Sequence, residues 1–231
     1  MGNTGVAVSK VVAKLASVGV DEASHNFLQD CFKQFGIQVI PINGEAAQVL
    51  ARQKFEGCVV RLYAPNTKEV LDAARNSSSN RRMVIYGIAR NTAEALRYSS
   101  FGINAVFDEP LERQGVLRVV RSTHLLVIHE LRRYVRIPVV TEAMVEAGAK
   151  NMVAASVEVS AGGMSVLCST PIPLQDMVRI SFSLPGEKLI KVRAIVCWAR
   201  PSENLYGFRF DTSDAGRLLV RNWIDQYLEL V

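Results

Sequence analysis

The hydrophobic pattern of this 231-residue chain changes its period near Pro138. Before this proline, short apolar runs alternate with stretches of helical periodicity, whereas after it the apolar residues recur at strand spacing. Two periods indicate two folding units, and the chain is long enough for each unit to have its own core. We therefore expect an α/β domain over residues 1–124 and a β domain over residues 125–231.

The first domain is expected to hold five strands, each followed by a helix. The expected strands are Val11–Val20, Ile37–Ile42, Cys58–Tyr63, Met83–Ala89 and Ile103–Phe107. The helices between them are expected at 22–35, after an Asp21 cap and ended by Gly36, and at 43–55, 67–75 and 92–101. This alternation predicts a five-stranded parallel sheet with helices on both faces.

The order of these elements resembles the receiver domain of response regulators. The segments Asn43–Ala47 and Phe101–Ala105 are similar to loops of that family. The resemblance implies the fold, and it implies that a working receiver would accept a phosphoryl group on an aspartate after the third strand. Acidic residues after the first strand would hold Mg²⁺ beside that aspartate.

The residues that this chemistry needs are missing from the sequence. Arg61 and Leu62 stand at the end of the third strand, and the expected acidic pair after the first strand falls near Gly19 and Val20, with Asp21 nearby. Glu109-Pro110 replaces the Lys-Pro of the family, while Gly87 and Ala89 offer no hydroxyl. We interpret this half as a pseudo-receiver that serves as an interaction or dimerisation module, and phosphotransfer ranks as a distant third function.

A helix is expected over residues 111–134, where no breaker follows Gly115. One face carries an apolar stripe, which consists of Val116, Val120, Thr123, Val127 and Leu131 and is broadened by Leu117, Leu125 and Ile128. Two interpretations stay open. The helix is either the last helix of its own domain, or it extends further and pairs with a second copy in a homodimer.

The second domain is expected to be a closed, six-stranded antiparallel barrel. Its strands are expected at 137–144, 153–160, 164–169, 177–184, 189–199 and 205–210. A last helix, capped by Thr212 or Ser213, should lay an apolar face against the barrel, and this face consists of Leu218, Leu219, Trp223, Ile224 and Tyr227. Trp198 and Trp223 are interpreted as core or lid packing groups.

Polar residues that suit a nucleotide gather at the start of this domain. Arg132 and Arg136 stand four residues apart, and the segment Glu158–Gly163 ends another apolar run. Arginine forks onto phosphate or onto guanine O6 and N7, and it also stacks on bases. Ser160 can donate a hydrogen bond to a phosphate oxygen, while Gly163 allows the main chain to come close to a ligand.

The ordered set resembles the PilZ domain family, which carries R-x-x-x-R, then (D/N)-x-S-x-x-G, then strands like Val196–Trp198 and Tyr206–Phe210. The resemblance spans 131–231 and implies binding of cyclic di-GMP. The implied ligand-binding residues are Arg132, Arg133, Arg136, Glu158, Ser160 and Gly163. Glu158 stands where the family has Asp or Asn, and its extra methylene moves the carboxylate outward.

Composition narrows the remaining function classes. The net charge of +5 suits an anionic ligand but is too small and too dispersed to indicate nucleic-acid binding. No apolar run is long enough to span a membrane. The four cysteines are isolated in the sequence, which predicts reduced, mostly buried thiols in a cytoplasmic protein. The three histidines are scattered and predict no metal site.

We therefore expect a cytoplasmic receptor for cyclic di-GMP that is not an enzyme and uses no other cofactor. Ligand capture would change its conformation or its binding to an unknown protein partner. The alternative is a PilZ-like scaffold that binds proteins and no nucleotide, and Glu158 favours this alternative.

Overall fold

A computed structural model describes residues 12–230 of the chain, so Val11 of the first expected strand lies outside the described residues. Within them, the chain divides into two compact units, residues 12–131 and residues 132–230. We call them the α/β unit and the barrel unit. Helix α5 (Arg113–Tyr134) is continuous through this division and contains residues 124 and 125.

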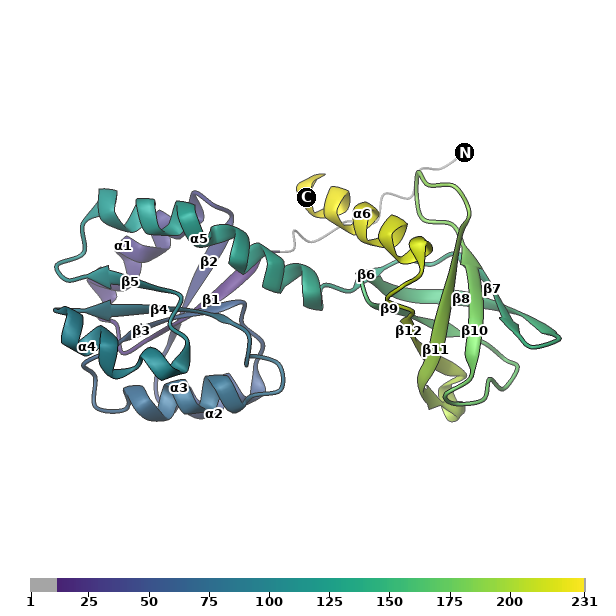
Figure 1. Cartoon of the computed structure of the whole chain (residues 1–231), viewed down its shortest axis with the longest axis horizontal. Coiled ribbons are helices and arrows are strands. Elements are labelled where there is room, and N and C mark those ends of the chain that lie inside the picture. Colours follow the sequence, from purple (N-terminus) through teal and green to yellow (C-terminus); the bar gives the residue numbers. More distant parts are fainter. Residues whose placement is uncertain (1–11, 231) are drawn as a thin grey trace. The chain divides into compact units, whose positions relative to one another are not determined.

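The α/β unit has the predicted parallel sheet, with strand order β2-β1-β3-β4-β5. The strands are β1 (Ala13–Val18), β2 (Ile37–Ile42), β3 (Gly57–Arg61), β4 (Val84–Ala89) and β5 (Ala105–Asp108). The remaining helices are α1 (Glu22–Lys33), α2 (Ala46–Arg52), α3 (Thr67–Asn76) and α4 (Thr92–Arg97), and a 3₁₀ helix, η1, covers Ser99–Phe101. Helices α1 and α5 cover one face of the sheet, and α2, α3 and α4 cover the other (Figure 1).

Local chemistry sets the ends of these helices. Asp21 caps α1 as predicted, because its Oδ1 accepts a hydrogen bond from the Ser24 backbone N–H at 2.9 Å. Two predicted helices were too long. Helix α2 begins at Ala46, since Gly44 has φ +89°, and α4 ends at Arg97 and gives way to η1.

Aromatic side chains fill the core between the sheet and helices α1 and α5. The ring of Tyr86 lies 5.3 Å from that of Phe32 and 5.4 Å from that of Phe107. Its hydroxyl is 2.9 Å from Thr123 Oγ1 on α5. Burial raises the pKa of Tyr86 to about 12, so this hydroxyl stays protonated and anchors α5.

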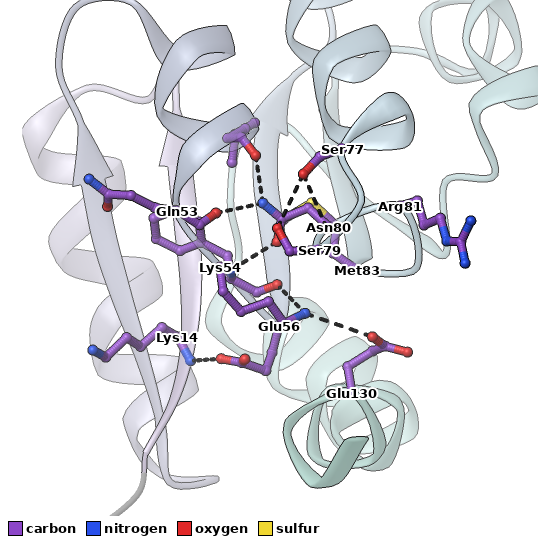
Figure 2. A network of polar contacts seen from close by, with 12 residues as sticks. Lys14, Gln53, Lys54, Glu56, Ser77, Ser79, Asn80, Arg81, Met83 and Glu130 are labelled. Carbon is purple, nitrogen blue, oxygen red and sulfur yellow. Dashed lines mark hydrogen bonds and ion pairs between the residues drawn. The ribbon is translucent and has the colours of Figure 1, made fainter. Parts of the chain in front are cut away.

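A buried polar network joins four segments of the α/β unit (Figure 2). Asn80, which is fully buried, accepts a hydrogen bond from the Phe55 backbone N–H at 2.9 Å. Its amide donates to the carbonyl oxygens of Leu50 and Gln53, each at 2.6 Å. These three bonds satisfy backbone groups left over where α2 ends and β3 begins.

The barrel unit contains β6 (Ile137–Pro138), β7 (Glu142–Ala147), β8 (Lys150–Ser160), β9 (Gly163–Leu167), β10 (Met177–Phe182), β11 (Ile190–Arg200) and β12 (Leu205–Phe210). A short 3₁₀ helix, η2 (Pro201–Glu203), joins β11 to β12. The sheet order is β6-β8-β7-β10-β11-β12-β9, and a further β8–β9 pairing closes it. The result is the predicted six-stranded antiparallel barrel, to which β6 adds a short arm along β8.

The strand predicted over 137–144 is in fact two strands, β6 and β7, which pair with different parts of β8. Ser156 fills the gap between them. Its hydroxyl accepts a hydrogen bond from the Thr141 backbone N–H at 2.9 Å and donates to the Val139 carbonyl. A side chain thus replaces a ladder bond and lets the chain bend.

Helix α6 (Ala215–Leu230) packs on β11 of the barrel. A Cβ on Gly216 would lie 2.1 Å from the Lys191 carbonyl oxygen, so the start of the helix rests directly on the strand. Two predictions for this helix were wrong. Asp214, not Thr212 or Ser213, precedes it and accepts from the Gly216 N–H at 2.8 Å. The predicted apolar face is confirmed at Trp223 and Ile224, which are buried together with Val220, and is wrong at Leu218 and Leu219, which are exposed.

Helix α5 buries Val116, Val120, Val127 and Leu131 as the predicted stripe required. Leu125 departs from that stripe, since it is 68% exposed on the opposite face beside Arg118 and Arg121. The reason is its position: it lies about 120° around the helix from Leu131 at 100° per residue. Within residues 12–230, no helix is both long and apolar enough to cross a membrane.

Candidate functional site

The predicted arginines lie at the end of α5 and on the segment that follows it. Arg132 and Arg133 belong to the last turn of the helix, and Arg136 precedes β6. Strand β6 pairs with the end of β8, so that Pro138 is opposite Glu158. This pairing brings Arg136 to the outer face of the barrel beside the second half of the motif.

The second half of the motif forms the bend between β8 and β9. Ser160 Oγ donates to the Gly163 carbonyl oxygen at 3.0 Å and closes the turn. A Cβ on Gly163 would lie 2.0 Å from the Phe208 carbonyl oxygen, so only glycine fits there. Two further bonds hold the bend, from the Phe210 N–H to the Gly162 carbonyl and from Arg217 Nε to the Ala161 carbonyl.

Arg136 and Glu158 form an ion pair next to this bend. Arg136 Nη1 donates to Glu158 Oε1 at 3.3 Å, and the arginine side chain remains 59% exposed. Ser160 lies two residues beyond Glu158 on the same strand and therefore shares its face. The structure thus brings Arg136, Glu158, Ser160 and Gly163 together in one place.

The other two arginines have different neighbours. Arg132 Nε lies 3.2 Å from Asp225 Oδ1 on α6, so this guanidinium is engaged in an ion pair. The guanidinium carbon of Arg133 lies 5.6 Å from the ring centroid of its neighbour Tyr134. Both are in the last turn of α5.

An exposed aromatic side chain shares the outer face with Glu158. Along one row of the barrel, Glu158 pairs with Ser165, Ser165 with Gly207, and Gly207 with Trp198. Three strand spacings separate the ends of this row, about 14 Å. A Cβ on Gly207 would lie 2.0 Å from the Trp198 ring, so the indole lies flat across the glycine and reaches toward Glu158.

The sequence interpretation placed Trp198 in a core or lid, but the side chain is 39% exposed on the outside of the barrel. The reason is a register shift between Val196 and Trp198, which inserts Cys197 as an extra residue and turns the tryptophan outward. Cys197 is consequently exposed, whereas Cys31, Cys58 and Cys168 are buried as expected.

A second charged cluster occupies the carboxyl edge of the parallel sheet. Arg61, at the end of β3, bonds Asp21 Oδ2 at 2.7 Å and Glu109 Oε1 at 3.1 Å. Tyr63 donates its hydroxyl to Glu109, and the Arg90 guanidinium lies 4.0 Å from the Tyr63 ring centroid. Ligands of open α/β sheets bind at this edge, and here internal ion pairs fill it.

We predict that Arg61→Met destabilises the α/β unit at neutral pH. Loss of the cation leaves the Asp21 and Glu109 carboxylates facing each other, at a cost between the roughly 1 kcal/mol of an exposed pair and the 3–5 kcal/mol of a buried one. Urea unfolding followed by circular dichroism measures it. Lys68→Met, which removes a cation from an exposed pair with Asp72, is the matched control and should change little.

The same substitution should alter the acid response. The Ser24 backbone N–H, together with Arg61, holds the pKa of Asp21 well below its usual range. A pKa lowered by folding adds stability above about pH 4, the ordinary value, and that stability is lost as the pH falls further. The difference between Arg61→Met and the parent should therefore shrink in acid, and a constant difference would contradict this account.

Among residues 12–230, no group of three or more histidine, cysteine, aspartate and glutamate side chains is arranged to hold a metal ion. In the α/β unit, Asp21 and Glu109 are the acids nearest the position where a working receiver would hold Mg²⁺, and both form ion pairs with Arg61.

The family model for the PilZ domain matches residues 130–229. No curated protein gives a match. Among solved structures, the chain is similar to the PilZ domain of CeSA from a cellulose-synthesizing bacterium, with 22% identity over 41% of this chain and 98% of the other and a TM-score of 0.35.

Two further structures show similarity. The motility inhibitor MotI/DgrA of Bacillus subtilis is 20% identical over 42% of this chain and 51% of its own, with a TM-score of 0.35. The receiver domain of a sensor histidine kinase from Pseudomonas aeruginosa PAO1 is 15% identical over 48% of this chain and 96% of its own, with a TM-score of 0.41. With the family match and the barrel topology in agreement, residues 130–229 of this chain are a PilZ domain.

Proposed function

We propose that the PilZ domain of this chain is a receptor for cyclic di-GMP. The observation that carries the proposal is the Arg136–Glu158 pair on the outer face of the barrel, next to the Ser160–Gly163 bend. Guanine presents acceptors at O6 and N7 and donors at N1 and N2. A guanidinium beside a carboxylate offers the complementary donors and acceptors.

The rest of this face suits the other parts of the ligand. Cyclic di-GMP carries two phosphates and two purine rings, which need cations and flat apolar surfaces. Arg132 and Arg133 supply the cations one helical turn before Arg136. Trp198, lying flat over Gly207, supplies a stacking surface at the far end of the row.

Ligand capture would be followed by a change of conformation or of partner binding rather than by chemistry. The proposed site contains cations, a carboxylate and a hydroxyl that is already bonded to a carbonyl, and none of these forms a nucleophile–base pair. The exposed Leu125 and Leu126 on α5 provide an apolar surface for an unidentified protein partner or for a second copy.

Calorimetric titration of the purified full chain with cyclic di-GMP tests this proposal. We expect saturable binding of cyclic di-GMP and none of GTP or cyclic GMP at the same concentrations. GTP carries one guanine and a triphosphate, so it controls for charge attraction alone. Equal heats from GTP would mean that the arginines attract any anionic purine, and this would contradict a dedicated receptor.

A second candidate is a PilZ scaffold that binds proteins only. It is favoured by the observation that both arginines of the motif already face carboxylates, Arg132 with Asp225 and Arg136 with Glu158. These internal pairs reduce the positive charge that a ligand would meet. Absence of any heat with cyclic di-GMP, in a chain shown to be folded, would select the scaffold.

A further inference from the structure

We propose that helix α6 is a latch on the ligand site, in which Asp225 competes with the ligand for Arg132. The inference rests on the proposed function, because it concerns how the same site is regulated. Helix α6 belongs to neither half of the binding motif, and the latch would give this helix a regulatory role.

Helix α6 contacts both parts of the proposed site. Asp225 Oδ1 lies 3.2 Å from Arg132 Nε, in the last turn of α5, and Arg217 Nε donates to the Ala161 carbonyl, in the bend, at 3.2 Å. Eight residues separate the two contacts, which is about 12 Å along a helix. These two contacts therefore tie α6, the yellow helix in Figure 1, to Arg132 and to the bend.

The two ends of α6 are held in different ways. Its first half rests on β11 through Gly216, and the Trp223 indole N–H donates to the Pro185 carbonyl at 3.0 Å. Both contacts precede Asp225, which is half-buried beside Arg132. The helix is thus anchored to the barrel from its start to Trp223, just past its midpoint, whereas the ion pair lies further along its second half.

The ion pair opposes an anionic ligand by charge. A phosphate that approaches Arg132 meets the Asp225 carboxylate at the same guanidinium, and two like charges at this separation repel each other. Capture of the ligand therefore requires Asp225 to move away or to share the guanidinium. Either change loosens the second half of α6, which makes this half the element that responds to the ligand.

Removal of the competing charge should tighten binding. We expect Asp225→Asn to bind cyclic di-GMP about two- to fivefold more tightly than the parent, the range given by a partly exposed ion pair. Asp214→Asn is the matched control: it also removes one carboxylate that pairs with an arginine, Arg193, in the same domain. Asparagine retains the capping ability that the Asp214 position needs.

The measurement is calorimetry on the parent and both variants, together with amide hydrogen exchange in α6. Exchange over 225–230 should rise in Asp225→Asn without ligand, and in the parent when cyclic di-GMP is added. If Asp225→Asn binds cyclic di-GMP and the parent does not, this result would also support the latch. The site would then be closed in the parent and opened by the substitution.

The remaining outcomes separate the latch from the receptor. If the parent binds and Asp225→Asn binds equally or more weakly, the latch is overturned and the receptor stands. If Asp214→Asn tightens binding as much as Asp225→Asn, the gain is a general charge effect and the latch is again overturned. If no variant binds, the receptor proposal fails, and with it the competition on which the latch depends.

Discussion

Replacement of Arg136 by alanine should weaken cyclic di-GMP binding by at least roughly a hundredfold, since two hydrogen bonds to a charged group contribute about 1.5–3 kcal/mol each. Arg136 is the motif arginine that pairs with Glu158, two residues before Ser160 of the bend. Its side chain is mostly exposed, so the substitution should leave the barrel intact. Calorimetric titration of the full chain measures the loss.

Arg179→Ala is the control for this experiment. It removes the same charge from the same domain, on an exposed position of β10. Arg179 pairs with Glu146, and Glu146 pairs with Asn151 on β8. Asn151 and Glu158 are seven residues apart along this strand, which is about 23 Å. Binding that weakens equally in both variants would show that net charge, rather than this site, governs affinity. Unaltered binding by Arg136→Ala would remove the central contact of the proposed receptor.

The sequence predicted the architecture of both units because long periodic segments carry their own signal. β2 and β12 were predicted to the residue, and the parallel order followed from the strand–helix alternation. The predicted element bounds were wrong where the contacts of a single side chain override the hydrophobic period. Ser156 breaks one predicted strand into two by bonding backbone groups of Val139 and Thr141, and such a contact between distant residues leaves no periodic trace.

The sequence predicted only part of the candidate site. The spacing of Arg136, Glu158 and Ser160 could be read along the chain, and β6 pairing with β8 does bring these residues together. The engagement of Arg132 with Asp225 could not be anticipated, because it depends on where α6 lies on the barrel. The outward turn of Trp198 was missed since it needs the extra residue at Cys197.

The buried network around Asn80 leads to the second large effect, on the stability of the α/β unit. Asn80→Ala removes the partners of the Phe55 N–H and of the Leu50 and Gln53 carbonyls. An unsatisfied buried polar group costs about 1–3 kcal/mol, so three of them should cost roughly 4 kcal/mol after relaxation. This is a large part of the 5–15 kcal/mol that usually keeps a domain folded.

The distribution of tryptophan allows this loss to be assigned to one unit. Both tryptophans, Trp198 and Trp223, belong to the barrel unit, so their fluorescence follows the barrel, whereas circular dichroism follows the helices of both units. In Asn80→Ala, the helical signal should be lost at much lower urea than in the parent, while the fluorescence transition stays in place. Two separate transitions are expected, because a two-unit chain need not unfold in one step.

Asn91→Ala provides the comparison for Asn80→Ala. Asn91 is exposed and caps α4 through the Glu94 N–H at 3.0 Å, so its replacement should cost only about 1 kcal/mol. The same chemical change is thus made at a buried junction and at an exposed helix end. If the two variants unfold at the same urea concentration, the Asn80 bonds add no more than an ordinary cap. The account of how the α2–β3 connection is held would then be wrong.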